Sequence, residues 1–105
     1  MTTDELVIRC SVVRAQKLPQ GVTAESICDS VRRAANPALD QAKLAPNALS
    51  VRITVESETK LTAAATLQGK SLPEHHVSIS DRPLNARAVS MLANAIAADV
   101  TSARR

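Results

Sequence analysis

The 105-residue sequence predicts an α+β fold, a two-layer open-faced sandwich in which a mostly antiparallel sheet carries both helices on one face. Three observations predict the element order β-α-β-β-β-α. Four segments alternate apolar and polar residues, as strands with one buried face do. Two other segments repeat apolar residues at steps of three and four, as amphipathic helices do. The last three strand segments are joined by short turns, which favours antiparallel hairpins. We therefore expect residues 1–105 to form one α+β domain with an ordered core at about residues 5–101.

The opening segment, at about residues 5–14, is predicted to be the first strand. Its inward positions begin at Leu6 and its outward positions begin at Val7. Because strand side chains alternate between the two faces, Cys10 should point inward and Val13 outward.

The first helix is predicted to begin after Thr23, whose hydroxyl suits an N-cap. Val22 stands where it can pack against Ile27 across that cap. Asn36-Pro37 is expected to break or kink the helix, because proline lacks an N–H and restricts the residue before it. A second short helix would then start at Pro37 with Asn36 as its cap.

The apolar period changes from 3.6 to 2 beyond the helical region. Strands are predicted at residues 49–56, 61–68 and about 74–80, separated by turns. A final helix is predicted over residues 86–100, with Asn85 as its N-cap. These elements complete the sheet and its second helix.

The composition limits the classes of function. Apolar residues make up 45% of the chain and charged residues 22%, but aromatic residues are absent. The core must therefore be aliphatic, and the chain lacks the stacking platforms that single-stranded nucleic-acid sites use.

A net charge of +3, spread along the chain, predicts no obligatory polyanion partner. No apolar run is long enough to span a bilayer, so we expect no membrane insertion. The chain as written suits the cytoplasm, or the periplasm if it is a processed fragment.

Cysteine and histidine are the residues to weigh for chemistry. Cys10 and Cys28 have neither C-x-x-C spacing nor nearby histidines, so they are predicted to be two buried thiols, without a metal or a disulfide. His75 and His76 should project to opposite faces of a strand, which prevents joint chelation of one metal. We predict no catalytic residue, no metal ligand and no cofactor. If the protein is an enzyme with an unrecognised site, Cys28 and His76 are its candidates.

The outer face of the predicted sheet is the candidate interaction surface. It is expected to display Arg9, Arg52, Thr54, Thr62, Thr66, His76 and Ser78. Polar outer faces are common in antiparallel sheets, so simple solvation is one interpretation. The other is a non-catalytic interaction or assembly module that binds a protein partner, or a second copy of itself, through this face or through an edge strand.

A hairpin, a glycine turn, a short strand, a corner and an amphipathic helix follow one another between residues 49 and 100. They read Arg52-Ile53-Thr54-Val55, Leu61 to Leu67, Gly69-Lys70, Val77 to Ser80, Asp81-Arg82-Pro83-Leu84, and Ala86 to Val100. This order resembles the closing part of the amino-terminal domain of the TolB translocation protein and its TolB-like relatives. The resemblance implies a non-enzymatic α+β module for protein contacts.

The order helix, three strands, helix is also similar to that of a double-stranded RNA-binding domain. Such domains read RNA shape through basic residues in their loops and at the start of the last helix. Here those positions would be held by Lys60, Lys70, Arg82 and Arg87. The similarity implies nucleic-acid binding as the alternative function, although the Lys-Lys-x-Ala-Lys cluster of that family is absent.

Overall fold

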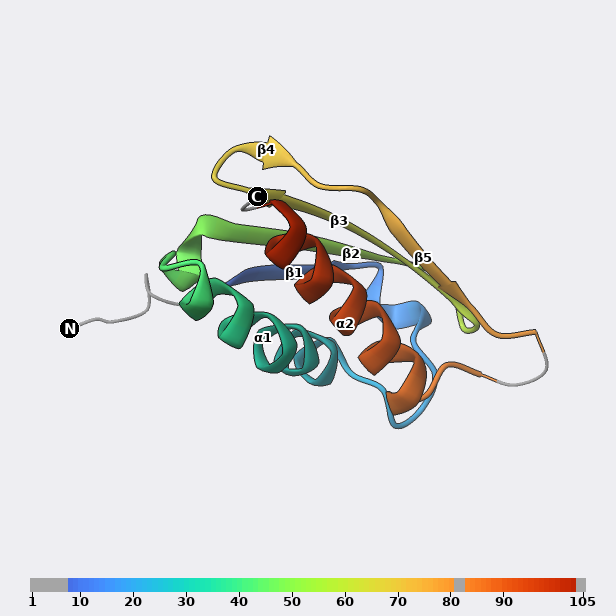
Figure 1. The fold of residues 1–105 in the computed structure, drawn as a ribbon. Coiled ribbons are helices and arrows are strands. Elements are labelled where there is room, and N and C mark those ends of the chain that lie inside the picture. The colour runs from blue at the N-terminus through green and yellow to red at the C-terminus, as the bar shows by residue number, and fades with distance from the viewer. Residues whose placement is uncertain (1–7, 81–82, 104–105) are drawn as a thin grey trace.

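The computed structural model describes residues 8–80 and 83–103 and has the predicted α+β architecture. Its strands and helices are β1 (Arg9–Val13), α1 (Ala24–Gln41), β2 (Leu49–Ser57), β3 (Lys60–Leu67), β4 (Lys70–Ser71), β5 (His75–Ser78) and α2 (Ala86–Ala103). The strands form one open sheet, and both helices lie on the same side of it (Figure 1). The predicted fold class is confirmed.

The sheet is mostly antiparallel, with one parallel pair at its edge. β1 runs parallel to β2, and α1 makes the crossover between them. β2 and β3 form an antiparallel hairpin. β3 then pairs antiparallel with β4 near its end and with β5 near its start. The sheet order is therefore β1-β2-β3, with β4 and β5 sharing the far side of β3.

The core lies between the sheet and the helices and is wholly aliphatic. Its largest completely buried side chains are Ile8, Ile27, Val31, Leu39, Leu49, Val51, Ile53, Val55, Leu61, Leu92, Ile96 and Val100. Burying one such side chain contributes about 1.5–3 kcal/mol. Most of these residues come from the two helices and from β2 and β3. They form one apolar layer between the helices and the sheet face that the helices cover.

The start of α1 follows from local sequence. Thr23 Oγ1 accepts a hydrogen bond from the Ser26 N–H, and Ser26 Oγ accepts one from the Thr23 N–H, each at 3.0 Å. This reciprocal cap satisfies donors that a helix end leaves unpaired. Val22 and Ile27 are both buried, as the predicted packing across the cap requires. At α2, Asn85 Oδ1 accepts from the Ala88 N–H at 3.0 Å, so its predicted capping role is confirmed.

The predicted break at Asn36-Pro37 is wrong, because α1 continues through Pro37 to Gln41. The proline removes the N–H that would bond to the carbonyl of Arg33. Arg33 lies on an exposed face, where water can bond to that carbonyl. Ala35 and Leu39, on either side of the proline, are buried in the core. Tertiary packing therefore keeps the helix continuous, although Pro37 destabilises it locally.

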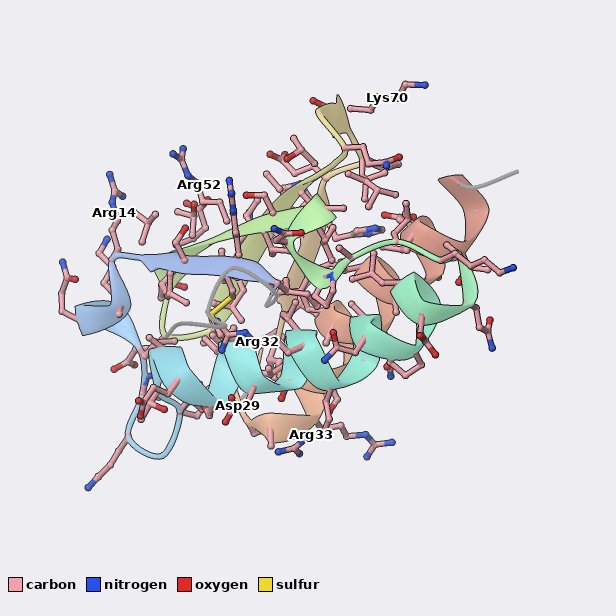
Figure 2. All side chains as sticks on the ribbon, turned by 90° about the vertical axis from the view of Figure 1, so that its left-hand side faces the viewer. Arg14, Asp29, Arg32, Arg33, Arg52 and Lys70 are labelled. Carbon is pink, nitrogen blue, oxygen red and sulfur yellow. A yellow bond between two sulfur atoms is a disulfide. The ribbon has the colours of Figure 1, made fainter. Side chains whose placement is uncertain are left out.

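The prediction of two free thiols is also wrong. Cys10 on β1 and Cys28 on α1 form a disulfide, with their Cα atoms 5.8 Å apart and 18 positions apart in sequence. Figure 2 shows this bond between the sheet and α1. Each cysteine was correctly placed on an inward surface, but alternation and helical spacing do not give the distance between two elements. The two inward positions face each other within the normal disulfide range.

Two strand boundaries differ from the prediction. β1 begins at Arg9, and the predicted residues 5–7 lie outside the described part of the chain. The turn expected at residues 69–73 contains the two-residue strand β4, and the N–H of Leu72 donates to the carbonyl of Ala65 at 2.8 Å. The segment after β3 therefore pairs with both ends of β3, through β4 and β5, and not through β5 alone as the sequence predicts.

Candidate interaction surface on the outer face of the sheet

The strand register brings the outward side chains into rows across the sheet. Val13 on β1 lies beside Thr54 on β2, Thr54 beside Thr62 on β3, and Thr62 beside His76 on β5. Partners in a register share one face, so the row crosses the sheet opposite the helices. The alternation of polar residues in the sequence was the signal that predicted this arrangement.

The predicted surface residues share the outer face but differ in exposure. Arg9, Arg52, His76 and Ser78 are exposed, and Thr54 and Thr66 are half-buried. Thr62 is 8% exposed, so it is not available for direct contact as we expected. Exposure therefore varies along the face: the paired residues Arg52 and Ala64 are exposed, whereas the next pair, Thr54 and Thr62, is largely covered.

Thr62 is buried because its neighbours close over it with hydrogen bonds. Its hydroxyl donates to Glu56 Oε2 at 3.2 Å and lies 3.0 Å from His76 Nδ1. Since the carboxylate takes the single hydroxyl proton, Nδ1 must carry the proton that completes the second bond. Glu74 Oε1 lies 3.6 Å from the other ring nitrogen of His76. This network fixes the position of His76 on the outer face.

A hollow of about 360 Å³ lies on the outer face, with Ala64 in its lining. Its other lining residues include Ser50, Arg52, Thr66, Ser71 and Glu74. Arg52 supplies a positive group to the hollow and Glu74 a negative one. Sequence reasoning missed this feature, although a signal existed: Ala64 is the small side chain between the outward positions Thr62 and Thr66.

The basic residues predicted for nucleic-acid binding are not gathered together. Lys60 begins β3 and Lys70 pairs with Leu67 at its other end, so they lie at opposite ends of the strand. Arg87 is near the Lys60 end, because the N–H of Leu84 donates to the carbonyl of Glu58. Arg82 lies outside the described residues. Figure 2 shows Lys70 on the same side as Arg14 and Arg52, which point away from α1.

The residues considered for catalysis have structural partners. Cys28 is bonded to Cys10 and is therefore not a free nucleophile. His75 is directed to the helix face, where Nε2 bonds to Asp99 Oδ2 and joins β5 to α2. His76 lies on the opposite face, as predicted for neighbouring strand residues. Among residues 8–80 and 83–103, no three His, Cys, Asp or Glu side chains gather in a way that could hold a metal.

Neither α1 nor α2, the two long helices of the described residues, is both long and apolar enough to cross a membrane. Comparisons with protein families, with curated proteins and with solved structures find no match for the chain. The likenesses to TolB and to double-stranded RNA-binding domains thus remain predictions from sequence.

Proposed function

We propose that the protein is a non-catalytic interaction module that binds a protein partner through the outer face of its sheet. The observation that carries the proposal is the hollow beside Ala64, which lies on the face opposite both helices. A concave site flanked by opposite charges gives a partner both a position and an orientation. The partner or a second copy of the chain would insert a side chain there.

The hollow is lined by Ala64, Ala65 and Leu72 as well as by polar residues, which favours a side chain with an apolar stem and an amide end, such as glutamine. Arg52 can donate to its oxygen and Glu74 can accept from its nitrogen. Around this centre, arginine is a residue type enriched in protein interfaces, and Val13 is 38% exposed on the same face. The hydrogen-bonded His76 is already ordered, which lowers the entropy cost of binding.

We also propose that the protein works in an oxidising compartment, which favours the periplasm, the alternative predicted for a processed fragment, over the cytoplasm predicted for the chain as written. The support is the Cys10–Cys28 disulfide, since such bonds persist outside the reducing cytosol. Acid quenching of native cells, followed by alkylation of free thiols, tests this. We expect no alkylation of the protein without prior reduction. Two alkylated cysteines in the unreduced sample would contradict the compartment proposal.

Photo-crosslinking in native cells tests the interaction surface. A photoreactive amino acid is placed at position 71, an exposed serine that lines the hollow, or at position 98, an exposed alanine on α2. We expect a crosslinked protein adduct from position 71 and none from position 98. Arg52→Glu, which reverses one charge of the hollow, should reduce the adduct at position 71.

Three results would count against the proposed surface. The first is no adduct at either position, the second is equal adducts at both, and the third is an adduct insensitive to Arg52→Glu. Sedimentation over a wide concentration range then shows whether an adduct of twice the chain mass reflects a dimer in solution. A strictly monomeric protein would assign the outer face to a different partner.

A further inference from the structure

β5 forms an edge of the sheet, and within the described residues no backbone partner bonds to its far side. Among the described strands it pairs only with β3, and Figure 1 shows it at the border of the sheet. The N–H of Ile79 donates to the carbonyl of Thr59 at 2.9 Å. Hydrogen bonding alternates along an antiparallel strand, so Val77 also faces β3 with its backbone groups. The N–H and C=O groups of His76 and Ser78 therefore point away from the sheet.

A groove of about 220 Å³ runs beside this edge, between β5 and the first turns of α2. Half-buried Val77 on β5 and Ile79 directly after β5 line one side, and Ala88 and Met91 on α2 line the other. Met91 is 60% exposed, the more exposed of the two large hydrophobic side chains that lie open to solvent among the described residues. The groove thus offers apolar surface directly next to unpaired strand backbone.

The groove has a positive rim. Ser78, Asn85 and Arg87 complete its lining, and no acidic residue is among the described residues that line it. Within residues 8–80 and 83–103, Arg87 makes no ion pair. Its guanidinium therefore favours an occupant that brings a carboxylate.

The other edge of the sheet is occupied differently. At β1, Arg32 Nε donates to the carbonyl of Ile8 at 3.4 Å, and the disulfide ties Cys10 to α1. A side chain of α1, that of Arg32, therefore bonds to a backbone carbonyl at that edge. β5 combines backbone groups that are unpaired within the described residues with an adjoining apolar groove.

We propose that an extended polypeptide segment of a partner protein adds to β5 as a further strand. Its backbone would bond to His76 and Ser78, one apolar side chain would enter the groove against Met91, and an acidic side chain would pair with Arg87. Strand addition supplies affinity through backbone bonds, and pockets for alternate side chains supply specificity. This site deepens the proposed role as an interaction module, but it is separate from the outer-face hollow.

A displayed library of eight-residue peptides tests the proposal. The peptides carry Val, Ile or Leu at one position and either Glu or Lys two positions away, so that both side chains of an added strand face the groove. We expect enrichment of peptides with Glu, and Arg87→Glu should reverse the preference toward Lys. Selected peptides are then synthesised, and their affinities for the whole chain are measured by titration.

Ser78→Pro and Ser78→Ala form a matched pair for the backbone contact. Proline removes the outward N–H of residue 78, which edge strands tolerate, whereas alanine keeps it. We expect at least about tenfold weaker binding for Ser78→Pro and little change for Ser78→Ala. Met91→Glu, on the exposed face of α2, provides a second blocking variant that leaves β5 unaltered.

Ala64→Arg, which fills the outer hollow, separates the two sites and should leave peptide binding unchanged. No enrichment of Glu peptides, or binding that survives both Ser78→Pro and Met91→Glu, would overturn the proposed strand addition. Absence of the position-71 crosslink with peptide binding intact would instead refute only the outer-face function. Self-association abolished by Ser78→Pro would show a second copy as the occupant and overturn the partner assignment.

Discussion

At the scale of single residues, Thr62 shows how hydrogen bonds order part of a polar outer face. Its hydroxyl has a carboxylate on one side and an imidazole on the other, and the side chain is 8% exposed. A buried hydroxyl is stable only with hydrogen-bond partners, and both are supplied by outward-facing neighbours. Sequence alternation predicted the face of Thr62 but not its burial, which depends on the side chains that lean over it.

Thr62→Val should lower the free energy of unfolding by about 1 kcal/mol, because it removes two hydrogen bonds while keeping the side-chain shape. The matched control is Thr66→Val on the same strand and face. Thr66 Oγ1 makes no hydrogen bond to the described residues, so its replacement should be neutral or slightly stabilising. Urea denaturation of the three proteins measures the difference. Equal stabilities of the two variants would contradict the structural role of the network.

At the scale of elements, α1 is held together by its packing and by its bond to β1. Pro37 stands inside the helix, and the buried residues on both sides of it keep the helical path. The disulfide then fixes α1 to the edge strand. Neither feature follows from local sequence preference, which favoured a break at Pro37 and gave no distance from Cys10 to Cys28.

Pro37→Ala should raise the free energy of unfolding by about 1–3 kcal/mol. The substitution restores the N–H that bonds to the Arg33 carbonyl and removes the ring that crowds it. Part of the gain is offset because proline also restricts the unfolded chain. Pro73→Ala, in the loop before β5, is the control and should give no comparable gain. A loss of stability in Pro37→Ala, measured by thermal and urea unfolding, would contradict this account of α1.

The variant with both Cys10→Ala and Cys28→Ala should unfold with a free energy about 3 kcal/mol lower than the oxidised protein. The disulfide closes a loop of 18 positions, and its removal gives the unfolded chain more freedom. Denaturation in oxidising and reducing buffer provides the measurement. Reductant should destabilise the natural sequence and leave the double variant unchanged. If reductant leaves the free energy of unfolding of the natural protein unchanged, the disulfide does not stabilise the fold.

At the scale of the whole molecule, the sequence predicted the layers better than the surface features. Periodicity predicted both helices, the hairpin from β2 to β3 and the inward direction of the core residues. The hollow beside Ala64 depends on neighbours from adjacent strands. The groove beside β5 depends on where α2 crosses the sheet edge. Such features require three-dimensional distances that a single linear pattern does not contain.

The distribution of positive charge gives an expected outcome for the nucleic-acid alternative. Because Lys60 and Lys70 lie at opposite ends of β3, they do not form one cluster for phosphates. We expect no binding of duplex RNA tighter than about 100 µM even at low salt, where phosphate contacts are strongest. Fluorescence anisotropy with labelled duplex RNA checks this. Tight, salt-sensitive binding that Lys70→Glu weakens would restore the alternative.

The all-aliphatic interior also determines how the molecule behaves in an optical experiment. With no Trp, Tyr or Phe anywhere in the chain, its one described near-ultraviolet chromophore is the bond between Cys10 and Cys28. The protein therefore has almost no intrinsic fluorescence. Any indole emission from a mixture must come from the added ligand. A change in the emission of a tryptophan-labelled peptide would therefore measure its binding, with no background from the protein.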